Sequence, residues 1–274
     1  KLEHFSVHIE RTKSPISESL LLHAISHNEV LPYYQPKINR HDNRVESIEV
    51  LARLNTSKED EVVLPDRFIC IAEDLDLINL ITFQLFEKAT NDFNEIKEHF
   101  DPNLKLAFNL SPSQLEDLSC PDKLALILHL NKLTPSEVIL EITEQYALRS
   151  AAQLETLNRL RMRGFGISLD DFGTGFSTFN YLKQLPAQHV KIDGSFVRDM
   201  LNDPIDLALV KAINDISRSL DKRSVAEYVE NKEIFLALKE IGIDYGQGYF
   251  IARPVPVEKI TSELERISTD KLFS

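Results

Sequence analysis

The chain of 274 residues contains no tryptophan, two cysteines, eight glycines and no block of basic residues. So little glycine excludes a low-complexity or glycine-rich chain. The longest apolar run, Leu124–Leu130, is interrupted by His129 and is far shorter than the roughly 20 residues that cross a membrane. The net charge of −12 argues against tracking along a nucleic acid, which requires a basic stripe. We therefore expect no polymeric nucleic-acid partner and no membrane segment in this chain.

The two cysteines, Cys70 and Cys120, stand in no metal-ligand or redox spacing. Two reduced thiols and the lack of a signal peptide predict a cytoplasmic protein. Because the chain begins at Lys1 rather than Met, we expect residues 1–16 to be a leader that links to a missing upstream region. An upstream sensory or regulatory domain would fit that organisation, and residues 17–274 would then form one domain.

Short β-branched or apolar runs alternate with amphipathic helical stretches along the chain. Eight runs are expected to be strands: Tyr33–Ile38, Val45–Leu54, Leu106–Leu110, Val138–Ile142, Gly166–Asp170, His189–Asp193, Ser224–Glu227 and Gln247–Ile251. Helix signals separate the later ones. Asp203-Pro204 opens one helix, and another runs from a cap at Asn231 to Gly242.

Repeated strand–helix units predict an α/β fold with a parallel sheet, and eight strands in one domain favour a TIM-like (β/α)8 barrel. The first two strands are separated by a short turn around 41–44, with no helix between them. They form a hairpin, so one strand must be antiparallel. An open doubly wound sheet is the alternative, but no GxGxxG motif follows the first strand.

Polar side chains stand at or near the ends of most predicted strands. They are Glu49, Asn109, Glu141, Asp170, Asp171, Lys191, Asp193, Glu227 and Gln247. Each has an ordinary explanation when taken alone: a surface charge, a helix cap or a buried ion pair. In a barrel, however, the carboxyl ends of the strands converge on one rim, where active sites lie. Their joint occurrence therefore predicts a single site.

The residue types in this set favour a divalent-metal site. Carboxylates and an amide carbonyl are hard oxygen ligands that suit Mg²⁺, Mn²⁺ or Ca²⁺, and no His or Cys cluster indicates zinc. The carboxylates are too many for one ion and suit a pair that activates water at a phosphodiester. Asp170 and Asp171 would face opposite sides of a regular strand, so we expect a bend there, which Gly173 and Gly175 would permit.

The ordered set of motifs resembles the EAL-domain family of bacterial cyclic di-GMP phosphodiesterases over about residues 17–256. The matching stretches are Tyr-Tyr-Gln-Pro (33–36), Glu-Val-Leu-Ala-Arg (49–53), Phe-Asn-Leu-Ser (108–111), Glu-Ile-Thr-Glu (141–144), Asp-Asp-Phe-Gly-Thr-Gly (170–175), Lys-Ile-Asp (191–193), Ala-Glu-Tyr-Val-Glu (226–230) and Gln-Gly-Tyr (247–249). The resemblance implies a barrel with one antiparallel strand. It also implies hydrolysis of cyclic di-GMP to linear pGpG with two Mg²⁺ or Mn²⁺ ions.

The same resemblance implies roles for individual residues. Lys191 would hold the attacking water or the phosphate, with Gln247 and Glu230 supporting it. Glu144 would anchor the loop 172–177, which in this family joins the active site to a dimer interface, so a homodimer is expected. Two further sets follow. The metal ligands would be Glu49, Asn109, Glu141, Asp170, Asp171 and Glu227, and the substrate contacts would be Gln35, Arg53 and Asp193.

Three positions depart from the family pattern. Val50 replaces the alanine of the signature triplet, and Leu54 replaces an aromatic residue. Tyr228 replaces the glycine expected after Glu227, where a bulky ring would crowd the carboxylate or reshape the pocket mouth. Three alternatives stay open: an inactive cyclic di-GMP receptor, a scaffold that works by protein contacts, and a metal hydrolase with another phosphodiester substrate.

Overall fold

The computed structural model describes residues 14–56, 62–143, 150–174 and 179–270, with backbone alone for 179–181. Internal contacts group the chain into two compact units, residues 1–31 with 52–85 and residues 32–51 with 86–274. The expected leader 1–16 falls almost wholly outside the described residues.

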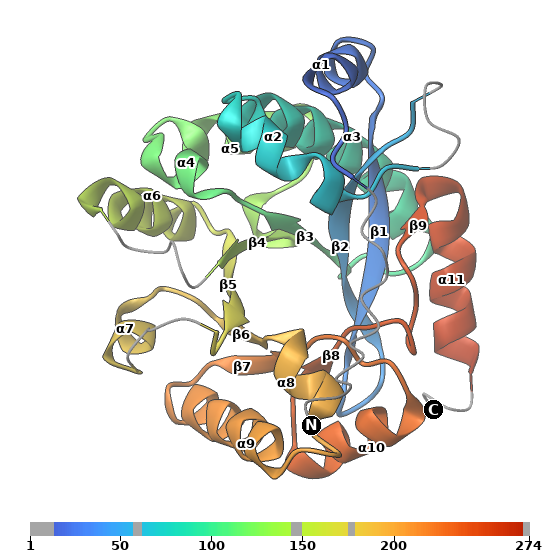
Figure 1. Cartoon of the computed structure of the whole chain (residues 1–274), viewed down its shortest axis with the longest axis vertical. Coiled ribbons are helices and arrows are strands. Elements are labelled where there is room, and N and C mark those ends of the chain that lie inside the picture. The colour runs from blue at the N-terminus through green and yellow to red at the C-terminus, as the bar shows by residue number, and fades with distance from the viewer. Residues whose placement is uncertain (1–13, 57–61, 144–149, 175–178, 271–274) are drawn as a thin grey trace, which may run out of the picture. The chain divides into compact units, whose positions relative to one another are not determined.

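The strands form one nine-stranded sheet in the order β2-β3-β4-β5-β6-β7-β8-β1-β9, and a further β1–β2 pairing closes it. They run β1 Val30–Asn39, β2 Val45–Leu54, β3 Lys105–Asn109, β4 Val138–Thr143, β5 Gly166–Phe172, β6 His189–Ile192, β7 Arg223–Ala226, β8 Tyr245–Gly246 and β9 Val255–Pro256. Figure 1 shows the ring of strands viewed end-on.

The pairings from β2 through β8 are all parallel, whereas β1 pairs antiparallel with β8 and β9. The predicted barrel and its single reversed strand in the ring are therefore confirmed. The reversal follows from the short turn after β1, because the five residues between Asn39 and Val45 leave no room for a crossover helix. As a result, the start of β1 lies at the same rim as the carboxyl ends of the parallel strands.

The predicted eighth strand, Gln247–Ile251, is wrong. The strand is Tyr245–Gly246, and the chain turns immediately after it, because the Ile251 amide donates to the Gly248 carbonyl at 3.0 Å. At Gly248 the backbone passes so close to Val229 that a Cβ would overlap it. Ile251 is fully buried, so its apolar character comes from packing in a turn rather than from a strand.

The helices of the second unit follow the strands, and their caps are those read from the sequence. Asp203 caps α9 through the Ile205 amide, and Asn231 caps α10, which ends at Gly242 with φ 83°. The helices wholly in this unit are α4 Pro112–Glu116, α5 Cys120–Leu130, α6 Ala151–Met162, α7 Phe179–Gln184, α8 Gly194–Asp199, α9 Pro204–Ser219, α10 Lys232–Ile241 and α11 Val257–Thr269, with the 3-10 turn η2 Pro135–Glu137.

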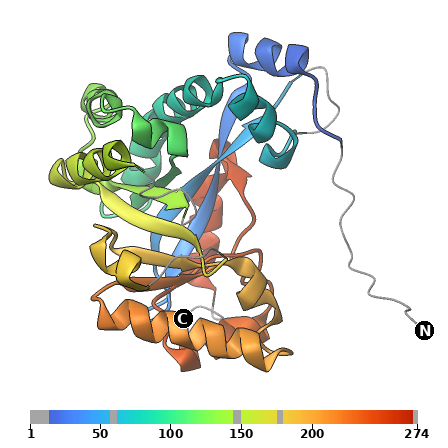
Figure 2. The same ribbon diagram turned by 60° about the vertical axis from the view of Figure 1, so that its left-hand side comes forward.

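Helices α6, α9 and α10 lie outside the ring of strands (Figure 1). Helices α9 and α10 remain side by side when the view is turned (Figure 2), and the Asn214 amide donates to the Ile241 carbonyl at 3.3 Å. Both helices are amphipathic, with Val210 and Leu238 fully buried. Burying one such side chain contributes about 1.5–3 kcal/mol, so this layer holds the strands, and the rim they form, in place.

The first unit contains α1 Glu18–Ser26, the 3-10 turn η1 Pro65–Arg67, α2 Ile69–Asp74 and the start of α3 Ile78–His99. Its core includes Leu21 and Phe68, both fully buried. Cys70 in this unit and Cys120 in the other are free thiols. Among the described residues no helix is both long and apolar enough to span a bilayer.

Candidate active site

Lys191 lies on β6 at the centre of the site, with its side chain 1% exposed. Its ammonium lies within 4 Å of carboxylates that come from four other parts of the barrel. The distances from Nζ are 2.7 Å to Glu141 Oε2, 3.0 Å to Glu227 Oε1, 3.1 Å to Asp170 Oδ1 and 3.5 Å to Glu49 Oε2. Residues up to 178 positions apart in the chain therefore converge on one ammonium group.

The parallel register explains this convergence. Asn109 pairs with Glu141 across β3 and β4, and Thr143 pairs with Asp170 across β4 and β5. Polar side chains at the carboxyl end of each strand are thus carried to the same level of the barrel. Glu227 follows β7 directly and completes the set.

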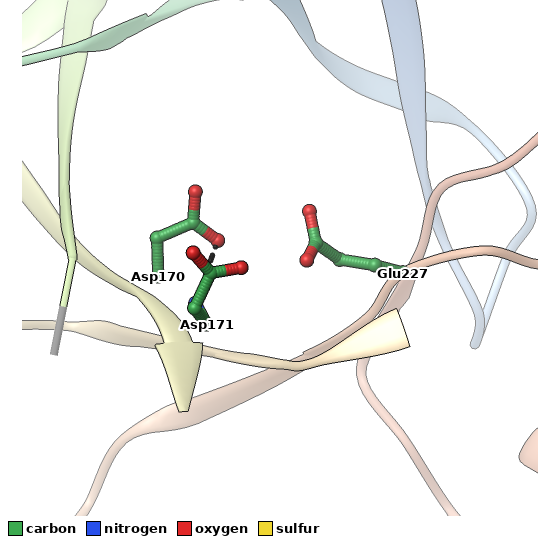
Figure 3. A group of neighbouring side chains, drawn as sticks. All are labelled: Asp170, Asp171 and Glu227. Atoms are coloured by element: carbon green, nitrogen blue, oxygen red, sulfur yellow. Dashed lines mark hydrogen bonds between the residues drawn. The ribbon is translucent and has the colours of Figure 1, made fainter. Parts of the chain in front are cut away.

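Asp170 and Asp171 both point toward Glu227, as Figure 3 shows. One ligand atom from each of the three lies within 4.8 Å of the others. The expected bend is present, but it occurs at Asp171 itself, whose φ is +54°, and the pairing of β5 with β6 shifts register there. The Asp171 amide donates to Asp170 Oδ1 at 3.0 Å, which fixes the turned conformation.

A non-glycine residue with positive φ costs about 1–3 kcal/mol and persists where the surroundings enforce it. Gly173, with φ +106°, continues the bend, and Gly175 lies outside the described residues. The strain at Asp171 is therefore the local cost of turning two adjacent carboxylates to one side.

The carboxylate of Glu49 is held by two amides. Asn109 Nδ2 donates to Oε1 at 2.8 Å and Gln247 Nε2 donates to Oε2 at 2.6 Å. Gln247 also contacts Gln35 Oε1 at 3.2 Å, and Gln35 Nε2 donates to the Ala252 carbonyl at 3.0 Å. Because Asn109 uses its NH₂ group toward Glu49, its carbonyl oxygen can face a cation.

Lys37 on β1 is a charged member of this site that sequence reasoning missed. Its side chain is 3% exposed, and its Nζ lies 3.7 Å from Glu141 Oε1. The signal was strand alternation, since Gln35 and Lys37 occupy the same face of β1. The strand-end pattern does not include Lys37, because this residue stands inside a strand rather than at the end of a parallel one.

The site carries an excess of negative charge. Five carboxylates (Glu49, Glu141, Asp170, Asp171 and Glu227) face two ammonium groups. Burial lowers the pKa of Lys191, but the carboxylates of Asp170, Glu141, Glu227 and Glu49 outweigh it and hold the pKa well above its usual range. Lys191 is therefore an ammonium ion at all physiological pH values.

The pKa values of two acids in the site are raised as well, which for a carboxyl group disfavours the charged form. Burial raises the pKa of Glu227 well above its usual range, with Lys191 opposing and Asp170 and Glu49 adding to the rise. Burial, together with Asp170 and Asp193, raises the pKa of Asp171 to about 6. Carboxyl groups that resist ionisation for want of counter-charge fit divalent cations, and their oxygens are the donors that Mg²⁺ and Mn²⁺ prefer.

The remaining predicted residues that the structure describes make contacts of their own. Asp193 caps α8 by accepting from the Ser195 amide at 2.8 Å. The exposed Glu230 lies 4.0 Å from Nε of Arg198. Arg53 is buried in the first unit, where it donates to the Ala52 carbonyl at 2.8 Å, and Glu144 lies outside the described residues. Their proposed roles stay predictions.

The fold and the site together define the class as a closed α/β barrel with a carboxylate–ammonium cluster at the carboxyl ends of its parallel strands. The sequence model of the EAL domain family matches residues 19–254. The chain belongs to the EAL domain family.

Two curated relatives illustrate the similarity. Cyclic di-GMP phosphodiesterase PdeB of Shewanella oneidensis is 35% identical over 88% of this chain and 28% of its own length. Cyclic di-GMP phosphodiesterase RocR of Pseudomonas aeruginosa is 33% identical over 86% of this chain and 60% of its own length. This chain therefore spans less than two thirds of these relatives.

Solved structures show the same fold. The PaMucR phosphodiesterase in complex with c-di-GMP superposes with a TM-score of 0.83 at 34% identity, over 88% of this chain and 97% of that one. The FimX EAL domain of Pseudomonas aeruginosa bound to c-di-GMP has a TM-score of 0.76 at 28% identity, over 86% and 95%.

Proposed function

We propose that this chain is a metal-dependent phosphodiesterase that hydrolyses cyclic di-GMP to linear pGpG. The observation that carries the proposal is the buried Lys191 ammonium, within 4 Å of four carboxylates from separate strands or strand ends. Such a cluster is costly to bury without further cations, and a phosphodiester is an anion that needs them. Relatives named for this activity and complexes with c-di-GMP support the substrate.

The donor set fits a pair of Mg²⁺ or Mn²⁺ ions. Bound there, they would acidify a water molecule and offset the charge of the phosphate. The residues that would hold them are Glu49, Asn109, Glu141, Asp170, Asp171 and Glu227.

Lys191 would donate to the phosphate or to the attacking water, because its ammonium is charged and already aimed among the ligands. Gln247 would act through Glu49, whose carboxylate it orients at 2.6 Å. Glu230 would support this network from outside it. Glu144 would anchor the adjoining loop. Gln35, Arg53 and Asp193 would contact the nucleotide.

The direct test is to incubate the purified chain with cyclic di-GMP and either Mg²⁺ or Mn²⁺ and to separate the products by chromatography. We expect pGpG with metal and none in excess EDTA. Glu141→Gln should lose the activity, because Glu141 contacts Lys191 and is a proposed ligand. Glu137→Gln is the matched control, since that glutamate pairs with Lys97 outside the site. Folded wild type that forms no pGpG with either metal would refute the proposal.

A cyclic di-GMP receptor without turnover is the second candidate, and one observation favours it. Tyr228 places a large ring directly after Glu227, with φ +50°. Calorimetry with metal present separates the two functions: a receptor binds cyclic di-GMP and leaves it intact.

Assembly and context form a separate part of the proposal. A homodimer, a regulatory domain upstream in the sequence and a cytoplasmic setting are expected for a signalling phosphodiesterase of this kind. Light scattering of the purified chain tests the dimer, and a mass of one chain (31.4 kDa) at all concentrations would exclude it.

A further inference from the structure

Tyr228 is held in an unfavourable backbone conformation next to the metal-site carboxylate of Glu227. Its φ is +50°, in the left-handed region where a bulky side chain is a genuine outlier. A glycine would occupy this conformation without strain. An outlier of this kind, beside an active site, calls for a functional explanation.

The ring of Tyr228 has a defined place. It packs against the backbone of Gly194 so closely that a Cβ there would overlap the ring. The Arg198 guanidinium lies 4.8 Å from the ring centroid, and Arg198 in turn lies 4.0 Å from Glu230. The ring therefore occupies space that is free only because Gly194 has no side chain.

The ring is fixed but only partly covered. Tyr228 is 50% exposed, although its neighbours Ala226 and Val229 are fully buried. A large aromatic surface is thus presented to solvent one residue from Glu227. A strained and exposed aromatic residue contributes little to the core, so stability does not explain its presence.

We propose that Tyr228 is a specificity-determining residue whose exposed ring stacks on one guanine base of the substrate while Glu227 serves the phosphate. The proposal rests on the function proposed above. Every base has a flat π-face, and stacking on an aromatic side chain strengthens binding substantially. Stacking needs no positive field, which suits a chain with a net charge of −12.

The position relative to Glu227 supports this role. Because Tyr228 and Glu227 are adjacent, the distance between the ring and the phosphate site is set by the chain itself. Arg198, placed over the ring, adds a planar cation that also stacks on bases. A purine nucleotide bound at Glu227 would thus meet a flat surface on this side of the site.

The test compares Tyr228→Asn with Tyr228→Phe. Asparagine tolerates positive φ but has no ring, whereas phenylalanine keeps the ring. With cyclic di-GMP and Mn²⁺, we expect Tyr228→Asn to raise KM about 10-fold with kcat within about 3-fold of wild type. Tyr228→Phe should resemble wild type. Mn²⁺ affinity, measured by calorimetry, should be the same in all three proteins.

Two outcomes would overturn the proposal. An unchanged KM in Tyr228→Asn would mean that the ring does not contact the base. A fall in kcat together with weaker Mn²⁺ binding would mean that Tyr228 only positions Glu227.

Failure of the proposed activity is seen separately, as absence of pGpG from wild type. In that case the dissociation constant for cyclic di-GMP decides about Tyr228. A 10-fold weaker complex in Tyr228→Asn supports stacking, and equal affinity or no binding to either protein overturns it.

Discussion

The ammonium of Lys37 lies 3.7 Å from Glu141 Oε1 in the buried interior of the barrel, while the other carboxylate oxygen of Glu141 accepts a hydrogen bond from Lys191 at 2.7 Å. Neither Lys37 Nζ nor Glu141 Oε1 has a hydrogen-bond partner among the described residues. Glu141 is therefore held between two cations, and one of them is within ionic but not hydrogen-bond reach. The two cations partly offset the negative charge of the site. Oε1 of Glu141 still has a lone pair that no hydrogen bond from the described residues uses.

Lys37→Met should destabilise the metal-free protein and increase its response to metal. Removing the cation leaves Glu141 less compensated, at a cost of about 1–3 kcal/mol. At roughly 2–4 °C per kcal/mol, thermal unfolding in EDTA should begin several degrees lower. Added MnCl₂ should raise Tm more in the variant than in wild type. Calorimetric or fluorescence melting curves with and without Mn²⁺ measure both effects.

Lys222→Met is the matched control for that experiment. Lys222 is also buried, but its ammonium donates to the carbonyls of Leu185 and Ala187 at 3.0 and 2.6 Å rather than to carboxylates. Its loss should lower Tm equally with and without Mn²⁺. If both variants behave alike, Lys37 is only a structural residue.

Lys191→Met tests the central cation of the site. The variant loses the group aimed at the phosphate, so kcat should fall by about 100-fold or more. Mn²⁺ should still bind, because the five carboxylates remain and a competing cation is gone. Product formation and Mn²⁺ calorimetry measure the two effects, with Lys222→Met again as control. A kcat within 10-fold of wild type would remove Lys191 from the proposed chemistry.

The sequence alone predicted the parts of this site that depend on local pattern. Strand β2 and the ends of β3 and β4 were read from short apolar runs followed by Glu49, Asn109 and Glu141, and the hairpin followed from a turn too short for a helix. These features need only strand alternation and the rule that parallel strands end at one rim.

Features that depend on tertiary contacts were not predictable in this way. Strand β8 has two residues, Tyr245 and Gly246, too few to produce a pattern. A bend was expected from the two adjacent carboxylates, but its location at Asp171, where the pairing of β5 with β6 shifts register, is not reported by a sequence pattern. The pairing of Lys37 with Glu141 joins residues 104 positions apart, and only the closed barrel brings them together.

Asp171→Gly should stabilise the metal-free protein while abolishing activity. Glycine relieves the left-handed strain at φ +54° and removes a carboxyl group whose pKa is raised to about 6 by burial, Asp170 and Asp193. We expect a gain of about 1–3 kcal/mol at pH 7.5 in EDTA. Urea unfolding measures it, and pGpG formation should be lost because a proposed metal ligand is gone.

Asp171→Asn separates the charge effect from the strain effect, since asparagine tolerates positive φ. A carboxyl whose folded pKa is raised destabilises the fold as pH rises from about 4 through 6. The gain from Asp171→Asn should therefore be present at pH 7.5 and absent at pH 4. A gain that is equal at both pH values would show that the carboxylate charge is not its source.

His189 should make stability fall as the pH drops below 6.5. The residue is 9% exposed, and its ring lies 5.6 Å from the Tyr245 ring. Burial, with Lys37, Lys105 and Arg223, lowers its pKa to about 3, and Asp244 opposes the shift. The unfolded chain takes up a proton near pH 6.5 that the folded protein refuses until about pH 3. At pH 5, which is 1.5 pH units below the pKa of the unfolded chain, the protonation of His189 in the unfolded chain corresponds to a loss of about 2 kcal/mol in the free energy of unfolding.

The measurement is the free energy of urea unfolding at pH 7.5 and pH 5.0 for wild type, His189→Gln and His129→Gln. Glutamine cannot titrate, so His189→Gln should lose less stability between the two pH values than wild type does. His129 is exposed on α5, and its replacement should leave the pH dependence as it is in wild type. Titrating acids such as Asp171 contribute equally to the pH dependence of all three proteins, so their contribution cancels when the proteins are compared. Equal pH dependence in all three proteins would mean that the folded state accepts a proton at His189 as readily as the unfolded chain does.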